Sequence, residues 1–438
     1  MIQKIKNLFK VNFIKDVATL EMGKFASIGL GILSSVVFAR VLHVENYGIY
    51  GLVFALAGIL NILMNWGSMH ATITLLSTAY AQKNKDEIKN ILSYFVGLNL
   101  IKIFTLGIIF YILAPWLGNI FYHNEEIGHW ARVILLVGYI DIVFSMFVII
   151  LQVSRRITKL TLIETFKKFI ISTLPALLVI IGLGLFGLIL GHFIVAILFL
   201  IISFVVYSIY SPRDYLLPSF KEIFINTSFK VIFKYFKFGF LIAIDKNFGN
   251  LITIVPIFLL GMFVGPEQIS YFKIAVAYSS IPIMLLEPIS RLLNVQLPKS
   301  KEYGDKMFRQ HFFKTSVYSG LIVCIILIPL LFLASFLVKI FYGQEYLPSV
   351  SLIYYLSIMT LASSFAVGFS SLYRTLNKMN MSIILTISEL FLMIVLIIVF
   401  ANMFDPLKST VIIMSFLTAL FLSINFYIIN KYVFKKHE

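Results

Sequence analysis

The chain alternates between long apolar runs and short polar connections along nearly its whole length. Each run has about 20 residues or more, which is the length that a helix needs to cross a hydrocarbon core. The runs are not the short alternating segments of a membrane-spanning barrel. We place them at 17–42, 49–80, 90–114, 127–152, 160–182, 187–210, 238–263, 271–297, 312–337, 349–373, 381–402 and 408–430. The pattern predicts an all-α integral membrane protein with twelve transmembrane helices.

Composition and charge support this prediction and orient the helices. Hydrophobic residues make up 60% of the 438 residues and charged residues only 13%. In soluble domains, about a quarter of the residues are charged. The net charge of +16 would suggest a nucleic-acid partner in a soluble protein. Here lysine and arginine concentrate in alternate connections and near both ends of the chain. The positive-inside rule therefore predicts a multi-pass protein of the cytoplasmic (inner) membrane with both termini in the cytoplasm and no nucleic-acid partner.

Two stretches of the chain repeat the same spacing of charges. A shift of 222 positions carries Lys15 onto Lys237, Lys24 onto Lys246 and Glu45 onto Glu267. Further along, LAPWLGNIFYHNEE (113–126) is similar to LASFLVKIFYGQEY (333–346), with nearly the same offset. The repeat predicts two six-helix lobes related by a pseudo-two-fold axis along the membrane normal, with a substrate path between them. The expected division is an N-terminal lobe at 1–210, a linker at 211–237 and a C-terminal lobe at 238–438.

The linker is basic and amphipathic. It contains Pro212, Pro218 and the segment KEIFINTSFKVIFKYFK. Such a segment is typical of a cytoplasmic helix that lies along lipid headgroups.

Ionisable residues inside predicted spans are candidates for function, because they are costly in the membrane and usually face a cavity or a partner. Lys102 on the third span and Asp141 on the fourth lie at equal estimated depth, roughly 16–17 Å from the cytoplasmic end at 1.5 Å per residue. We expect them to form an ion pair. The pair either stabilises the N-terminal lobe or lines a cavity, and the sequence leaves both roles open.

Lys24 and Lys246 occupy equivalent places on the first helix of each half. Each heads a polar stripe at helical spacing, which favours a position in a cavity over snorkelling to the interface. Arg291 shares a face of the eighth span with Glu287, and the two could simply pair at i,i+4. Candidates that remain are Asp245, beside Lys246, and Glu389, which is isolated on the eleventh span.

No motif for catalysis stands out in the chain. There is no phosphate-binding GxxxxGK[ST], no HExxH and no GxSxG, and GLGLFG (182–187) lies between two apolar runs with no strand before it. The single cysteine, Cys324, excludes an internal disulfide and a thiolate metal cluster. We therefore expect a protein that is not an enzyme.

Two segments resemble a known family. FARVLHVENYGIYGLVFALAGILNILMNWG (38–67) and IFYGQEYLPS (340–349) are similar to segments of the Wzx-like polysaccharide flippases of O-antigen and capsule synthesis. These belong to the multidrug/oligosaccharidyl-lipid/polysaccharide superfamily, which has a MATE-like fold. The resemblance implies a bacterial flippase that moves an undecaprenyl-pyrophosphate-linked oligosaccharide by alternating access. It also implies membrane lipids, a polysaccharide polymerase and assembly proteins as partners.

The resemblance also implies roles for the charged residues. Basic cavity residues would bind the anionic head group, here Lys24, Lys246, Arg291 and Lys102. Coupling would use a proton or sodium gradient, with no other cofactor and no bound metal. The acids Asp141, Asp245, Glu287 and Glu389 are candidates for coupling or for balancing the cations.

Three alternatives differ from this interpretation in testable ways. A multidrug cation exporter would share the fold but would favour an acidic cavity without paired lysines. A major-facilitator porter would carry a Gly- and Arg-rich loop after its second helix, which AQKNKDEIKN (81–90) does not supply. A membrane-bound polymerase would carry a large outer loop with catalytic residues, and no predicted outer loop is long enough.

Overall fold

The computed structural model describes the backbone of residues 2–434, without the side chains of residues 2–21, 241–242, 245, 288, 291–292, 294–295, 299 and 432–434. All regular elements of this described part are helices. The chain separates into two compact units. Unit 1 comprises residues 1–43 and 56–247, and unit 2 comprises residues 44–55 and 248–438. The unit boundaries thus fall inside two helices, and the linker at 211–237 packs with unit 1.

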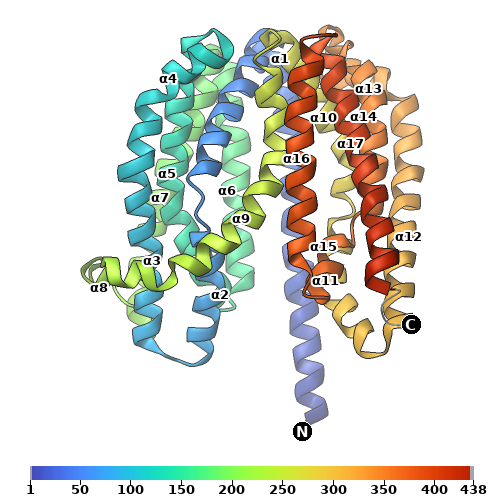
Figure 1. The fold of residues 1–438 in the computed structure, drawn as a ribbon. Helices are drawn as coiled ribbons and strands as arrows, with labels where there is room; N and C mark the ends of the chain where they lie inside the picture. Colours follow the sequence, from blue (N-terminus) through green and yellow to red (C-terminus); the bar gives the residue numbers. More distant parts are fainter. Residues whose placement is uncertain (1, 435–438) are drawn as a thin grey trace. The chain divides into compact units, whose positions relative to one another are not determined.

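Unit 1 is a bundle of long helices with a short helix across one end. In Figure 1, α5, α6 and α7 run along one another, while α8 and the start of α9 lie across the ends of the upright helices. Its elements are α1 (Ile2–Leu63), α2 (Ser68–Ala81), α3 (Lys85–Lys102), η1 (Ile103–Gly107), α4 (Ile108–Tyr122), α5 (Glu125–Val153), α6 (Ile157–Leu178), η2 (Val179–Leu183), α7 (Gly184–Tyr210), η3 (Ser211–Arg213), α8 (Phe220–Asn226) and most of α9 (Phe229–Leu260).

Unit 2 is a second helical bundle. In it α14 packs against α10, α12 and α17, and α16 packs against α17. Its elements are residues 44–55 of α1, the end of α9, α10 (Pro266–Met284), α11 (Glu287–Glu302), α12 (Asp305–Phe332), α13 (Ala334–Phe341), η4 (Gln344–Tyr346), α14 (Ser349–Phe365), α15 (Phe369–Thr375), α16 (Met379–Ala401), α17 (Pro406–Ile428) and η5 (Ile429–Phe434).

The helix ends follow from local sequence. Asn84, Asn124 and Asp405 cap α3, α5 and α17 by accepting backbone N–H groups of the first turn. Ser219 and Glu222 form a capping box at α8. The Ser219 backbone N–H donates to the Glu222 carboxylate and lowers the pKa of that carboxyl. These caps set where each apolar helix begins.

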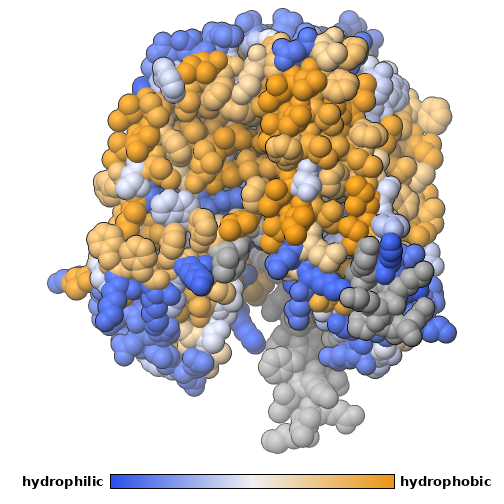
Figure 2. All heavy atoms as spheres, viewed as in Figure 1, coloured by the Kyte–Doolittle hydropathy of each residue, from blue (hydrophilic) through white to orange (hydrophobic). Residues whose placement is uncertain are grey.

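Eight segments of the described chain are long and apolar enough to cross a membrane. Apolar side chains form a broad band on the visible face of each unit, and hydrophilic ones gather at the ends (Figure 2). One segment, Ile157–Arg213, contains the expected fifth and sixth spans, with the turn between them at Gly182 and Gly184, both of positive φ. A multi-pass, all-helical membrane protein is confirmed. The count of twelve and the two-fold relation stay predictions.

Two of the expected spans are interrupted in their middle. The span at 49–80 breaks at Met64–Gly67, between α1 and α2, and the span at 271–297 breaks at Leu285–Leu286, between α10 and α11. The expectation of continuous helices is wrong here. The predicted shift of 222 positions carries residue 64 onto 286, so the two breaks occupy equivalent places in the predicted repeat. Paired interruptions of this kind point to binding sites in transporters.

Close backbone contact holds the first break in place. Gly67 has a φ of 70°, and a Cβ on it would lie 2.0 Å from the carbonyl oxygen of Gly239 on α9. Only glycine combines this left-handed conformation with this contact at no steric cost.

We expect Gly67→Ala to destabilise unit 1 by at least about 1–3 kcal/mol, the usual cost of such backbone strain, and the clash with Gly239 to add to it. Thermal unfolding of the purified protein in detergent measures the effect. Gly29→Ala is the matched control, because a Cβ at Gly29 would meet nothing within 4 Å. Equal unfolding temperatures for the two variants would contradict the contact.

Candidate functional site

A polar cavity surrounds the first helix break in unit 1, and we call it the broken-helix cavity. Its volume is about 170 Å³. Its walls come from the end of α1, the start of α2, the end of α3 and the middle of α5. The lining residues are Asn61, Met64, Asn65, Ser68, Met69, Phe95, Asn99, Lys102, Gly138, Tyr139, Ile142 and Ser145.

Lys102 is the buried cation of this cavity. Its exposed fraction is 6%, and its Nζ donates one long hydrogen bond of 3.5 Å to Ser68 Oγ. Ser68 in turn donates to Asn99 Oδ1 at 3.3 Å. No carboxylate among the described side chains pairs with this ammonium group. The interior of unit 1 therefore holds a lysine with neutral neighbours only.

An asparagine pair ties α9 to the break. Asn65 Nδ2 donates to Asn247 Oδ1 at 2.7 Å. Asn247 Nδ2 donates back to the Asn65 carbonyl at 2.8 Å. The unwound backbone at the break thus gains hydrogen-bond partners that a helix would have supplied.

The expected ion pair between Lys102 and Asp141 is wrong. Asp141 pairs with Lys167 of α6, with Nζ and Oδ1 2.7 Å apart. The same ammonium lies 4.0 Å from the ring centroid of Phe144. Lys102 and Asp141 have similar estimated depths in the membrane, but depth does not determine which side of a helix a residue occupies. Tyr139 and Ile142 of α5 face Lys102, while Asp141 is turned toward α6.

Lys24 and Lys246 both belong to unit 1. Lys24 is half-buried on α1, whereas Lys246 is exposed on α9 and lies within electrostatic range of His70 on α2. The serines in the stripe below Lys24 donate to their own helix, Ser27 to the Gly23 carbonyl and Ser34 to the Gly31 carbonyl. The symmetric placement of the two lysines across a path stays a prediction.

The sequence reasoning missed a pair of lysines on α6. Lys167 forms the ion pair described above, and Lys168 is half-buried. The Lys168 Nζ reaches toward α1, since a Cβ on Gly31 would lie 3.8 Å from it. The signal was present in the sequence, because two adjacent lysines ten residues into an apolar helix are ionisable residues inside a predicted span.

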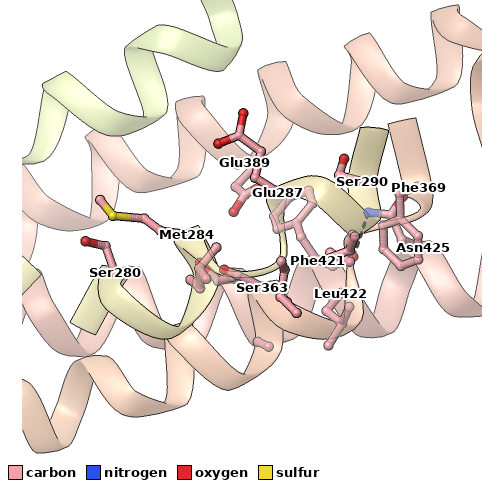
Figure 3. Close-up of a pocket in the computed structure, with 16 residues that line it drawn as sticks. Ser280, Met284, Glu287, Ser290, Ser363, Phe369, Glu389, Phe421, Leu422 and Asn425 are labelled. Carbon is pink, nitrogen blue, oxygen red and sulfur yellow. Dashed lines mark hydrogen bonds between the residues drawn. The ribbon is translucent and has the colours of Figure 1, made fainter. Parts of the chain in front are cut away.

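Unit 2 contains a larger cavity with acidic groups, which we call the acidic cavity. It consists of two adjoining hollows of about 560 Å³ each, which share Ser363, Glu389 and Thr418. Figure 3 shows Glu389 and Glu287 at the first hollow, from α16 and α11. Two carboxyl groups that are about 100 positions apart in the sequence thus line one space.

Glu389 makes no hydrogen bond or ion pair with any described residue, although it is partly buried. The second hollow also holds Lys273, which the sequence placed near a span end. Its Nζ lies 4.0 Å and 3.8 Å from the ring centroids of Tyr47 and Tyr50 and donates to the Tyr47 carbonyl at 3.4 Å. The lysine is therefore held by aromatic rings and not by Glu389.

Two predicted site residues lie outside the described side chains. These are Asp245 on α9 and Arg291 on α11. The expected pairing of Arg291 with Glu287 is therefore untested, and both residues stay predictions.

The pair of Asp141 and Lys167 generates a test. Their side chains are 32% and 14% exposed, so removing one partner should cost between the roughly 1 kcal/mol of a surface pair and the 3–5 kcal/mol of a fully buried one. We expect Asp141→Asn and Lys167→Met each to lower the unfolding temperature in detergent.

The double variant should lower the unfolding temperature by less than the sum of the decreases caused by Asp141→Asn and Lys167→Met alone. Lys102→Met serves as the control partner, because its effect should add to that of Asp141→Asn. The observed pairing would be contradicted if the effects of Asp141→Asn and Lys167→Met on the unfolding temperature simply added. It would also be contradicted if the effects of Asp141→Asn and Lys102→Met did not add.

The chain is similar to known proteins in sequence and in fold. In sequence, the chain is 21% identical over 275 residues to the teichuronic acid biosynthesis protein TuaB of Bacillus subtilis (strain 168). The match covers 63% of this chain and 54% of TuaB, so it spans about half the length of that relative.

In structure, the chain is similar to an inward-facing multidrug resistance MATE family transporter of the MOP superfamily. The TM-score is 0.76 at 15% identity, with 91% of this chain and 93% of that one covered. It is also similar to the lipid II flippase MurJ in an inward closed conformation, with a TM-score of 0.71 at 17% identity and 94% and 87% covered. The expected MATE-like fold is confirmed.

The family comparison covers most of the chain. Residues 37–351 match the family described as "Polysaccharide biosynthesis protein", and this region contains the broken-helix cavity and both helix breaks. The chain therefore belongs to the polysaccharide biosynthesis protein family and has a MATE-like membrane fold.

Proposed function

We propose that this protein is a flippase that moves an undecaprenyl-pyrophosphate-linked oligosaccharide across the bacterial cytoplasmic membrane by alternating access, without covalent chemistry. The family supports a role in polysaccharide synthesis. The fold is shared with a protein named a lipid II flippase. Lipid-linked saccharides must cross the membrane before they can be polymerised or attached outside.

The observation that carries the proposal is the excess of lysine in the helices of unit 1. Lys102, Lys168 and Lys246 have no carboxylate partner among the described side chains, whereas Asp141 is already neutralised by Lys167. A pyrophosphate cannot enter hydrocarbon unaided, because its hydration must be replaced. Charge-assisted hydrogen bonds from ammonium groups are the strong replacement for that hydration.

Unit 2 provides a candidate for coupling. Glu389 is a carboxyl group in an apolar hollow with hydroxyl neighbours, Ser363 and Thr418. Such a group can take up a proton, or bind Na⁺ with these hydroxyls as further oxygen ligands. A gradient of either ion could then bias the conformational equilibrium if the ion binds one state better.

The acidic cavity is also the observation that favours a second candidate, a multidrug cation exporter of the same fold. Glu287 and Glu389 would attract a cationic drug. Unit 1 argues against it, because uncompensated lysines would repel such a substrate. The two functions differ in which charged residues transport requires.

The linker suggests how the protein meets membrane lipids. Phe224, Ile225 and Phe229 are strongly exposed, at 50%, 74% and 69%, and Lys221 and Lys230 flank them in the sequence. Apolar and basic side chains on one short segment fit an anionic headgroup layer.

A polysaccharide polymerase and assembly proteins are the protein partners that this function would require.

For the lysines, we expect Lys24→Gln with Lys246→Gln to abolish glycan export in a flippase-null strain while membrane abundance stays normal. Arginine at each position should retain part of the export, because the charge survives with a different shape. Lys85→Gln, at the polar start of α3, is the control. Full export by the double glutamine variant would show that these lysines are not needed to bind the substrate.

For coupling, we expect Glu389→Gln to remove the dependence of transport on an imposed proton or sodium gradient in proteoliposomes, and Glu389→Asp to retain part of it. Lipid-linked saccharide reaching the outer leaflet is measured with and without each gradient. Glu302→Gln, at the exposed end of α11, is the control. A gradient response equal to that of the unmodified protein would refute the role of Glu389.

A further inference from the structure

Residues 44–55 of α1 pack in unit 2, and the same helix continues to Leu63 in unit 1. We call residues 44–55 the shared segment. Helices curve only gently unless proline or another break kinks them, and residues 44–63 contain no proline. A change in the arrangement of the two units must therefore bend this helix or detach the shared segment from unit 2.

The shared segment begins at a bend. His43, directly before it, has a φ of 59° and a ψ of 176°. Residues other than glycine rarely adopt this conformation, which persists only where the surrounding structure enforces it. The contacts that attach the shared segment to unit 2 therefore also hold a strained backbone in place.

Side chains of α10 attach the shared segment to unit 2. Ser270 Oγ donates a hydrogen bond to the Val44 carbonyl, and Lys273 Nζ donates to the Tyr47 carbonyl at 3.4 Å. A Cβ on Gly51 would lie 2.5 Å from Lys273 Cδ. Lys273 thus touches the shared segment with its stem and with its ammonium group.

Two tyrosine rings of the shared segment hold the Lys273 ammonium. Its Nζ lies 4.0 Å from the ring centroid of Tyr47 and 3.8 Å from that of Tyr50. The faces of aromatic rings attract a desolvated cation, but the rings have no net charge. A carboxylate that came within reach of the ammonium group would therefore compete with them.

Glu389 lines the same hollow of unit 2 as Lys273. The volume of that hollow is about 560 Å³, which is room for about 19 waters at 30 Å³ each. Ala277, one turn after Lys273 on α10, lines it as well and leaves the space beside the lysine open. Among the described residues that line this hollow and the adjoining one, the charged ones are Lys273, Glu287 and Glu389.

We propose that Lys273 is a positioning residue that moves its ammonium between the two tyrosine rings and the Glu389 carboxylate. When Glu389 is neutralised by a proton or a bound cation, the rings are the better partner and the shared segment is held. When Glu389 carries its charge, the lysine turns toward it on a flexible stem. Opposite charges attract strongly in an apolar hollow, and an unpaired carboxylate there is costly.

This movement, which we call the lysine switch, links the charge of Glu389 to the attachment of the shared segment. The inference deepens the proposed function, because it rests on Glu389 as the coupling residue. It names the side chain that transmits the charge of that residue to a helix that both units share.

The test follows hydrogen exchange of the shared segment by mass spectrometry, on the full-length protein in detergent at mildly alkaline pH, without substrate or gradient. Glu389→Gln removes the carboxylate, so Lys273 should stay on the rings. Exchange in residues 44–55 should then slow by roughly tenfold, which is the size of a desolvated contact between a cation and an aromatic ring. Most substitutions destabilise a protein, so a merely structural role of Glu389 does not predict this gain of protection.

A double variant tests whether the effect acts through the lysine. In the Lys273→Met background, Glu389→Gln should leave the exchange of residues 44–55 unchanged, because the group that responds to the carboxylate is gone. Lys273→Arg should restore part of the response, since arginine keeps the charge and also stacks on aromatic rings. Glu302→Gln and Lys339→Met, both at exposed positions of unit 2, are the matched controls and should exchange like the unmodified protein.

Two results would overturn the lysine switch. One is unchanged or faster exchange of the shared segment in Glu389→Gln. The other is an equal effect of Glu389→Gln in the presence and absence of Lys273.

The outcome is separable from that of the proposed function. If Glu389→Gln removes the gradient dependence of transport without slowing exchange of the shared segment, the coupling role stands and the lysine switch falls. If it slows exchange through Lys273 while the gradient dependence is intact, the lysine switch stands and the coupling role falls.

Discussion

A peptide group left without a hydrogen-bond partner in hydrocarbon costs several kcal/mol, and this constraint governs the whole structure. It explains why every regular element of the described chain is helical. It also gives meaning to the places where a helix is interrupted, since an unwound backbone is tolerated there only if protein groups or water satisfy it. At Met64–Gly67 the partners come from Asn65 and Asn247, and a polar cavity lies beside the break.

The two units divide the buried charges by sign. Unit 1 carries lysines at the helix break and along α6, with Asp141 engaged by one of them. Unit 2 carries Glu287 and Glu389 at one cavity, and its partly buried Lys273 lies against the rings of Tyr47 and Tyr50. A transporter that binds an anionic head group and uses a cation gradient needs both kinds of site.

Small residues allow the close packing that positions these sites. Gly67 touches the backbone of Gly239, and a Cβ on Gly128 of α5 would lie 2.2 Å from the Ala114 carbonyl of α4. Without a hydrophobic force between helices in lipid, such close approach is a main source of association. The contact at Gly67 places α9 against the break, so that packing and site geometry depend on the same residue.

The sequence by itself determined the class of this protein, because the length of apolar runs and the paucity of charge leave a helical membrane protein as the only solution. It also determined the family, through motifs at 38–67 and 340–349, and it identified Lys102 and Glu389 as groups that need an explanation. Only the tertiary structure decided which groups meet. Asp141 pairs with Lys167 and not with Lys102, because rotation about the helix axis, and not depth, selects the partner. The two helix breaks were also invisible in hydropathy, which averages over the four and two residues where the helices unwind.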